Sequence, residues 1–237
     1  MMSGFFGMVR RMVRSITTRG RVFAMLAVGG IGVAIGVFLD RADGVGAEAR
    51  VAYLSAFGLT VFVPLVVLVV ATATLGNLVE EKTLVYFWLR PVGRWQIALA
   101  GFVASMLVLL PLVLVPMGVL GAIVGDSNDL TGLLVASAVG VLGYGSIFTM
   151  LGLITQRALV WGLVYVLVWE GFVAGLSRTA GWLALRTHTT SILARISETP
   201  DLIDRPTEQS TVFIITAGIV AVAFMLTTLR LARMNVD

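Results

Sequence analysis

Six long apolar runs, separated by short polar connections, dominate the pattern along the chain. Each run has 18 or more residues, and about 20 are enough for a helix to cross the hydrocarbon core of a bilayer. In lipid every backbone N–H and C=O must find a partner, and the runs lack the strict alternation of membrane strands, so helices are expected. The pattern predicts an all-α integral membrane protein, a single domain over residues 1–237, with transmembrane helices at residues 22–39, 51–76, 96–124, 130–154, 159–176 and 211–229.

The residues before the first run predict a helix of another kind, lying along the membrane interface over residues 1–21. A basic, disordered tail is the alternative, but the helical spacing favours the helix. We expect its apolar side to lie in lipid and its basic side to face anionic headgroups. The apolar face carries Phe5, Val9, Met12, Val13 and Ile16, and the opposite face carries Arg10, Arg11 and Arg14.

The connection before the last run, residues 177–210, is much longer than the other connections on its side of the membrane. A structureless loop of this length is uncommon, and this one has apolar residues of its own, among them Trp182, Leu185 and Ile192. We expect two short helices that dip back toward the membrane as a re-entrant outer segment. Such a segment is tolerated where protein or water covers the broken backbone.

Composition supports the membrane assignment and narrows the chemistry. Hydrophobic residues make up 58% of the chain, charged residues only 13%, and there is no Cys and a single His. Thiol chemistry and a multi-His metal site are therefore excluded, and the net charge of +4 is too small to indicate a nucleic-acid partner.

The placement of the basic residues predicts the orientation. Six spans put both termini on one side, and that side collects most of the Lys and Arg residues but few acids. By the positive-inside rule, both termini and the connection near residue 80 are cytoplasmic, in a multi-pass protein of the cell membrane. The basic residues on this side are Arg10, Arg11, Arg14, Arg19, Arg21, Lys82, Arg90, Arg94, Arg157, Arg230 and Arg233.

One cytoplasmic connection combines charge with large apolar side chains. Residues 77–91 predict a short amphipathic helix that ends at Pro91, because the residue before a proline resists helical geometry. Its apolar surface, including Phe87 and Trp88, suits a groove on a partner protein or the membrane surface. A simple turn between two spans is the alternative.

This stretch, LVEEKTLVYFWLRPVGRWQIALAGF, resembles the junction between the second and third spans of type-two ABC exporter permeases, the membrane subunits driven by a separate ATPase. The stretches VWEGFVAGLS and LALRTHTTSILARI are similar to the end of that family's fifth span and to its outer re-entrant segment. The order of parts along the whole chain also agrees, although Lys82 stands where many members have Gly. The residues that match the junction motif are Glu80, Glu81, Thr83, Leu84, Arg90, Pro91, Gly93 and Arg94.

The resemblance implies a coupling helix over residues 77–91, on which two copies of an ABC ATPase act. It also implies a dimer, formed by this chain with itself or with a similar permease, that encloses the substrate pathway. Glu80, Glu81, Arg90 and Arg94 would fix the register through charge-assisted bonds, and the apolar residues would fill pockets. ATP and Mg²⁺ would belong to the partner ATPase, and this chain would be a non-catalytic subunit without a cofactor. Thr83, Leu84, Phe87 and Trp88 complete the predicted coupling set.

Glu170 is the only acid well within a predicted span, and intramembrane acids are functional suspects by default. We expect a polar latch to Arg178 or Arg186 of the outer segment. A hydrated carboxyl near the surface and a proton or cation site are the alternatives. Elsewhere, prolines predict kinks in the second and third spans, and small residues of the fourth span predict close helix contact.

Two other classes of protein fit the sequence less well. A secondary transporter would be expected to show internal repeats with interrupted spans at matched positions, whereas Pro64, Pro111 and Pro116 fall only in the first half. An intramembrane enzyme needs a nucleophile with a base, or metal ligands, and His188 alone supplies neither. With its threonine neighbours, His188 predicts a structural polar cluster. The substrate is not identified by the sequence.

Overall fold

The computed structural model describes residues 2–42, 45–80, 93–173, 181, 184–199, 202–203 and 207–234. Within these ranges the protein is almost wholly helical and has no strand. The elements are α1 (Met2–Ile16), α2 (Arg19–Arg41), α3 (Ala47–Tyr53), η1 (Leu54–Phe62), α4 (Val63–Glu80), α6 (Arg94–Val124), α7 (Ser127–Ile154), α8 (Ala158–Val164), η2 (Tyr165–Val173), α11 (Leu185–Ile196) and α12 (Gln209–Arg233).

Five of the helices are long and apolar enough to cross a bilayer, which makes the chain a membrane-embedded, multi-pass protein. They correspond to five predicted spans with slightly wider bounds, and the second continues without a break to Glu80. The fifth predicted span is described as a shorter apolar helix, Ala158–Phe172, that packs beside α4 and α7. The five long helices are Arg19–Arg41, Ala47–Val79, Arg94–Val124, Ser127–Ile154 and Gln209–Arg233.

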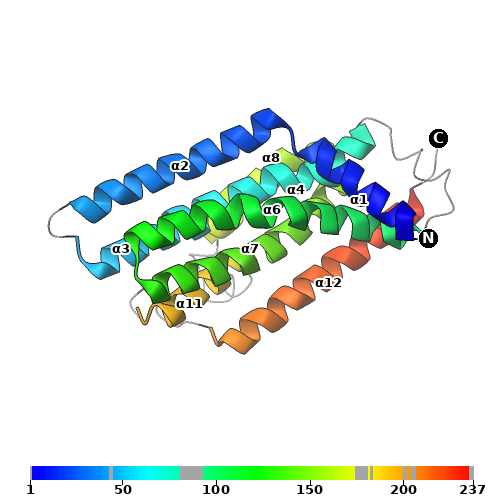
Figure 1. The fold of residues 1–237 in the computed structure, drawn as a ribbon. Coiled ribbons are helices and arrows are strands. Elements are labelled where there is room, and N and C mark those ends of the chain that lie inside the picture. The colour runs from blue at the N-terminus through cyan, green and yellow to red at the C-terminus, as the bar shows by residue number, and fades with distance from the viewer. Residues whose placement is uncertain are drawn as a thin grey trace.

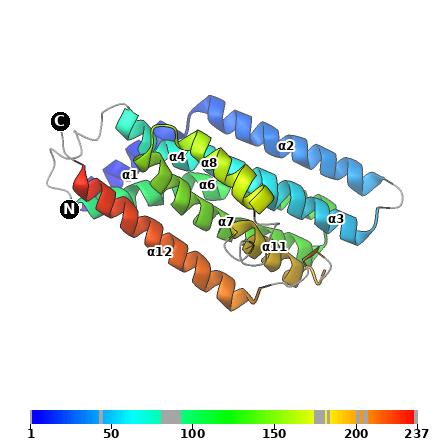
Figure 2. The same cartoon turned by 180° about the vertical axis from the view of Figure 1, so that it is seen from behind.

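The long helices form an elongated bundle, and its two ends differ (Figure 1). At one end, here called the near end, α1 lies beside the beginning of α6 and the C-terminal ends of α4 and α12. The opposite, far end holds the connections from α2 to α3 and from α6 to α7 (Figure 2). The predicted coupling segment begins at the near end, and its residues 81–91 lie outside the described residues.

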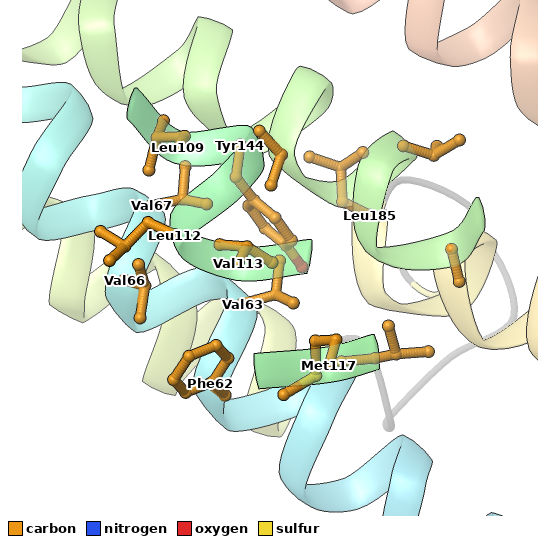
Figure 3. Close-up of a cluster of buried hydrophobic side chains, with 14 of the residues drawn as sticks. Phe62, Val63, Val66, Val67, Leu109, Leu112, Val113, Met117, Tyr144 and Leu185 are labelled. Atoms are coloured by element: carbon orange, nitrogen blue, oxygen red, sulfur yellow. The ribbon is translucent and has the colours of Figure 1, made fainter. Parts of the chain in front are cut away.

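Helix α7 is the centre of the bundle and contacts α4, α6, α11 and α12. Its small residues permit this, as the sequence predicts. A Cβ on Gly152 would lie 2.3 Å from the carbonyl oxygen of Thr72 on α4, and one on Gly143 would lie 2.6 Å from the Leu185 side chain on α11. In Figure 3 the ring of Tyr144 on α7 lies beside Val63 and Val113, from α4 and α6. Close backbone approach of this kind drives association between membrane helices.

The outer faces of α2, α8, η2 and α12 are covered by large apolar side chains. Phe23, Trp161 and Ile214 are 76%, 58% and 72% exposed. In water such continuous apolar surface would promote aggregation, whereas in a bilayer lipid tails cover it at no cost. These faces therefore lie within the membrane.

The prolines have different consequences in the two spans where kinks are predicted. Helix α6 runs without a break through Pro111 and Pro116. In the second span, the nine-residue π-helical segment η1 ends directly before the first turn of α4, which contains Pro64. A proline removes a backbone donor and crowds the carbonyl four residues earlier, and a π-helical turn relieves this crowding.

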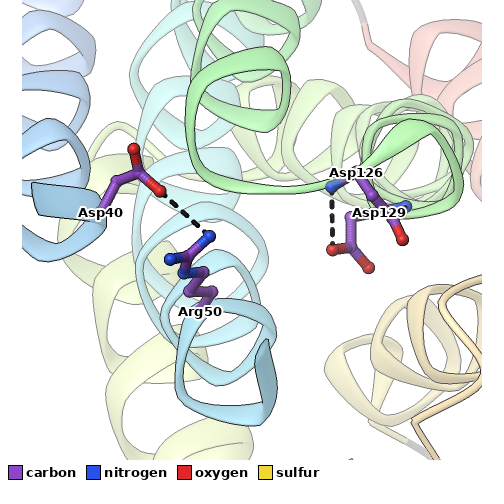
Figure 4. A network of polar contacts seen from close by, with 4 residues as sticks. All are labelled: Asp40, Arg50, Asp126 and Asp129. Atoms are coloured by element: carbon purple, nitrogen blue, oxygen red, sulfur yellow. Dashed lines mark hydrogen bonds and ion pairs between the residues drawn. The ribbon is translucent and has the colours of Figure 1, made fainter. Parts of the chain in front are cut away.

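Polar contacts at the far end fix the connections there. The Arg50 guanidinium pairs with the Asp40 carboxylate over 3.0 Å, which joins the beginning of α3 to the end of α2 (Figure 4). Asp126 caps α7 by accepting from the backbone N–H of Asn128 and Asp129, while the Asp129 carboxylate accepts from the N–H of Asp126. This reciprocal arrangement satisfies N–H groups that a helix start leaves open.

The first helix confirms the predicted spacing but not the predicted surroundings. Arg10, Arg11 and Arg14 are exposed on one face, as expected. The apolar face is instead buried in the near-end cluster, where Met12 packs with Leu78 of α4 and Ile97 of α6. The expectation that this face lies in lipid was wrong, because protein covers it. The helix also ends at Ile16, and α2 begins at Arg19 rather than at residue 22.

Candidate functional site around Glu170

The described part of the outer segment contains a half-length helix that reaches into the middle of the bundle. Helix α11 packs along α7 in the opposite direction: Leu185 lies against Gly143, Thr189 against Gly140 and Leu193 against Gly132. Its first turn is therefore near the midpoint of α7 (Ser127–Ile154), and its last turn is toward the far end. Its 12 residues span about 18 Å. Of the two short helices expected in this segment, one is described and packs inside the bundle, and the remainder of the segment lies partly outside the described residues.

Glu170, in segment η2, lies beside the N-terminal end of α11. Its side chain is 3% exposed and accepts four hydrogen bonds. The N–H of Leu185 donates to Oε1 over 3.0 Å, and the N–H of Arg186 donates to Oε2 over 2.9 Å. The hydroxyl of Tyr165 donates to Oε1 over 2.9 Å, and the hydroxyl of Tyr144 donates to Oε2. One carboxylate therefore joins η2, α7 and α11.

The chemistry of helix ends explains this arrangement. The first N–H groups of any helix lack partners within it, and a carboxylate suits the positive end of the helix dipole. Ala184, at the N-cap of α11, has no side chain that could accept such a bond. In a low-dielectric interior an unpaired backbone N–H destabilises the folded protein by roughly several kcal/mol. Glu170 supplies the missing cap from another element.

The expected latch between Glu170 and the outer segment is formed, but through different groups from those expected. A contact with the charged side chain of Arg178 or Arg186 was expected. Arg178 lies outside the described residues, and the contact with Arg186 is made by its backbone N–H. The phenols of Tyr144 and Tyr165 were not anticipated as partners. The signal that could have found them is the presence of polar aromatic residues in otherwise apolar spans.

The aromatic surroundings hold this carboxylate site in place. Tyr144 is fully buried, and its ring stacks on Phe148, with centroids 5.9 Å apart. The ring of Tyr165 meets Phe148 edge-on, with centroids 6.1 Å apart. Two phenols that share a third ring are limited to a few orientations, so both hydroxyls stay directed at Glu170.

Beyond its first turn, α11 carries a run of polar residues that is unusual in the middle of an apolar bundle. His188, Thr189, Thr190 and Ser191 are all buried. The Ser191 hydroxyl donates to the carbonyl of Thr187 and accepts from the backbone N–H of Thr207 over 3.1 Å. The polar cluster expected around His188 is therefore packed inside the protein and helps to attach the start of α12 to α11.

A cavity of about 360 Å³ lies between α11, which lines it with Arg186, Thr187 and Thr190, and the π-helical segment η1. Arg186 is the one charged residue among the described residues that line it. Among the described residues, no group of three His, Asp or Glu side chains has a geometry suited to a metal ion. The site as described can hold a helix end in place and offer a cation to a ligand.

At the near end, a second polar contact joins elements far apart in sequence. The Arg94 guanidinium, at the start of α6, donates to the backbone carbonyls of Leu231, Ala232 and Met234 at the end of α12. The bonds to Ala232 and Met234 are 2.7 and 3.2 Å long. The last carbonyls of a helix lack partners within it, and a cation there complements the helix dipole.

Arg94 is therefore the one member of the predicted coupling set whose side chain lies within the described part of the chain. Glu80 ends α4, but its side chain is outside that part. The remaining members, Glu81, Thr83, Leu84, Phe87, Trp88 and Arg90, lie in residues 81–92, which the structure does not describe.

Comparison with known proteins finds no matching family model and no curated protein with significant sequence similarity. The function therefore has to be argued from the arrangement of these residues.

Proposed function

We propose that this chain is the transmembrane subunit of an ATP-driven exporter, similar to the permeases of type-two ABC exporters. Two copies would enclose the substrate pathway, and two ABC ATPase subunits would act on them through residues 77–91. The observation that carries the proposal is the position of the junction motif. It begins at the near end, where α1, the start of α6 and the end of α12 are packed together.

The contact between Arg94 and α12 gives this motif a mechanical connection to the bundle. Arg94 is the last residue of the motif and donates to three carbonyls of α12. A force applied to the connection between α4 and α6 would therefore act on α4, α6 and α12 together.

The charge distribution supports a cytoplasmic near end. The exposed arginines of α1, together with Arg157 and Arg230, gather there. Both described chain ends also lie there, as an even number of crossings requires. We therefore propose a multi-pass protein of the cell membrane with both termini in the cytoplasm.

A secondary transporter is the alternative, and the two π-helical segments offer a test of it. In an inverted repeat of three plus three spans, the N-terminal half of the second span corresponds to the N-terminal half of the fifth. Segments η1 and η2 each have nine residues, and each follows a seven-residue α-helix, α3 or α8, so they lie at corresponding distances from the starts of the second and fifth helices. The alternative of a secondary transporter expects such a correspondence, and transport with an ion gradient in the absence of an ATPase distinguishes the two functions.

Replacement of Glu80, Glu81 and Arg90 by Ala tests the proposal. When the chain is reconstituted with a partner ABC ATPase that binds the wild-type chain, the triple variant is expected to lose ATPase binding and nucleotide-dependent transport. The same change at Glu48, Glu208 and Arg41, which are exposed at the far end, is the matched control and should have no effect. Unchanged binding and transport in the first variant, or transport by the chain alone with an ion gradient, would refute it.

A further inference from the structure

The cavity beside α11 is not used by the helix-capping role of Glu170. It lies where the first turns of α11 face the π-helical segment η1, and it is lined on opposite sides by Arg186 and Ser55. Its volume of about 360 Å³ falls within the range of about 300–1,000 Å³ that is common for small-ligand sites. Ala52 and Ala56, on its η1 side, are exposed, so the cavity is accessible from outside the bundle.

The described residues that line this cavity include one charged group, the guanidinium of Arg186. No carboxylate among them pairs with the Arg186 guanidinium. The Glu170 carboxylate accepts a hydrogen bond from the backbone N–H of Arg186. It forms no ion pair with the guanidinium, its oxygens already accept four hydrogen bonds, and it does not line the cavity. A guanidinium within a membrane protein is costly unless a partner or water reaches it, so an anion is the ligand group that this position favours.

Hydroxyl groups surround the same position. Ser55, Thr187 and Thr190 line the cavity, and within the described residues their hydroxyls make no hydrogen bond to protein. Thr60 also lines it and donates to the carbonyl of Ser55. A carboxylate or a phosphate accepts several hydrogen bonds at once, and a cation flanked by hydroxyl donors is the combination that binds such a group.

The remainder of the lining is apolar and limits the ligand further. Ala52 and Ala56 form one side, and Leu202 and Ile203 form another. A bare inorganic anion bound at Arg186 would leave the surface of these apolar side chains in contact with water. A ligand with an apolar body removes that surface from water, and its affinity rises with the apolar area that it covers. The lining therefore fits an amphiphile with one anionic head.

We propose that this cavity binds an amphiphile with a single anionic headgroup, a carboxylate or a phosphate, which Arg186 pairs with while the alanine and aliphatic side chains cover its body. A membrane lipid and a free amphiphilic anion share this chemistry. The proposal concerns the isolated chain and does not depend on the ATPase, so it can fail or succeed independently of the proposed function.

Binding of octanoate to the full chain in phosphatidylcholine nanodiscs, measured by calorimetry, tests the free anion. Arg186→Gln is expected to weaken octanoate binding at least 10-fold, and octan-1-ol and acetate should bind the wild-type chain at least 10-fold more weakly than octanoate. Arg195→Gln is the matched control, because Arg195 is exposed on the same helix and does not line the cavity. It should bind octanoate like the wild type.

Retention of bound lipid during purification tests whether the anionic ligand is a membrane lipid. The chain is purified from nanodiscs containing equal amounts of phosphatidylglycerol and phosphatidylcholine, and bound lipid is identified by native mass spectrometry. Loss of phosphatidylglycerol in Arg186→Gln, with retention in Arg195→Gln, would assign the site to a lipid headgroup. A dependence on Arg186 for octanoate alone would assign it to a free anion.

Two further variants guard against a folding defect. Arg186→Lys keeps the charge and is expected to retain binding within a few-fold of the wild type. Ala56→Phe fills the cavity from an exposed position and is expected to abolish binding without a change in the unfolding midpoint. If neither octanoate nor phosphatidylglycerol depends on Arg186, or if both still bind when Ala56→Phe fills the cavity, the proposal is overturned.

Discussion

The hydroxyl of Tyr165 donates to Oε1 of Glu170 over 2.9 Å, although the two residues are five positions apart on one helix. In an α-helix the backbone bonds join residues four apart, and side chains five apart point in different directions. Segment η2 is π-helical, and its bonds join residues five apart. The wider turn therefore places the phenol and the carboxylate on one face, where both reach the start of α11.

Loss of the Glu170 carboxylate should destabilise the protein strongly. Glu170→Ala would leave two buried backbone N–H groups and two phenol hydroxyls without an acceptor, at about 1–3 kcal/mol for each unsatisfied group. We expect a large fall in the thermal unfolding midpoint in detergent, whereas Tyr165→Phe, which removes one of four donors, should cost only about 1 kcal/mol.

The exposed residue Glu48 provides the control for this prediction. Glu48→Gln changes the same charge at the far end and should leave the unfolding midpoint unchanged. A midpoint for Glu170→Ala equal to that of the wild type would show that the four hydrogen bonds contribute nothing to stability.

Much of this fold follows from residue patterns in the sequence. Runs of apolar residues near 20 in length predict the five long helices, because only a helix satisfies its own backbone in lipid. A helix in the long connection before the last span was predicted from the length and apolar content of that connection. Its partner Glu170 was singled out because an acid inside a span needs a physical reason.

Other features could not be predicted because they depend on tertiary contacts. The amphipathic pattern of α1 indicates that one face is buried, but it does not distinguish lipid from protein, and Met12 is covered by protein. The π-helical geometry of η2, which brings Tyr165 to Glu170, has no periodicity signal of its own. The contact of Arg94 with α12 joins residues more than a hundred positions apart, and the sequence suggested a partner protein instead.

Close packing of α4 against α7 gives a sharp test with small side chains. In Gly152→Ala the new Cβ would meet the carbonyl oxygen of Thr72 at 2.3 Å, and backbone cannot move aside as a flexible side chain can. We expect a loss of about 1–3 kcal/mol, as for other overpacked positions. The unfolding midpoint in detergent measures it.

The matched variant is Gly218→Ala on α12, where nothing lies within 4 Å of the new Cβ. This change should be neutral or slightly stabilising, because Ala is a better helix former than Gly. Equal midpoints for the two alanine variants would contradict the close approach of α4 and α7.

Removal of the Arg94 side chain should loosen the end of α12. In Arg94→Gln the carbonyls of Leu231, Ala232 and Met234 lose their charged donor. We expect faster amide hydrogen exchange over the last turn of α12, measured by mass spectrometry, with little change in the middle of that helix. Arg94→Lys should give an intermediate rate, because an ammonium group lacks the planar fork of donors.

Arg157 is the control for this change, since it is exposed in the turn between α7 and α8 at the same end of the bundle. Arg157→Gln removes the same charge and should leave exchange in α12 as it is in the wild type. If both variants accelerate exchange equally, general charge at the near end, and not the specific contact of Arg94, stabilises α12.

Because one face of α1 is buried against the bundle and the other is exposed, substitutions on the two faces should change stability by different amounts. Met12 is 1% exposed and packs in the near-end cluster, so Met12→Ala is expected to cost about 2–5 kcal/mol. Arg11→Gln, on the exposed face, should change stability by less than about 0.5 kcal/mol. Unfolding midpoints in detergent, without any bilayer, measure both. If lipid rather than protein held the apolar face, Met12→Ala would leave the midpoint in detergent unchanged, and the packing of α1 on α4 and α6 would be refuted.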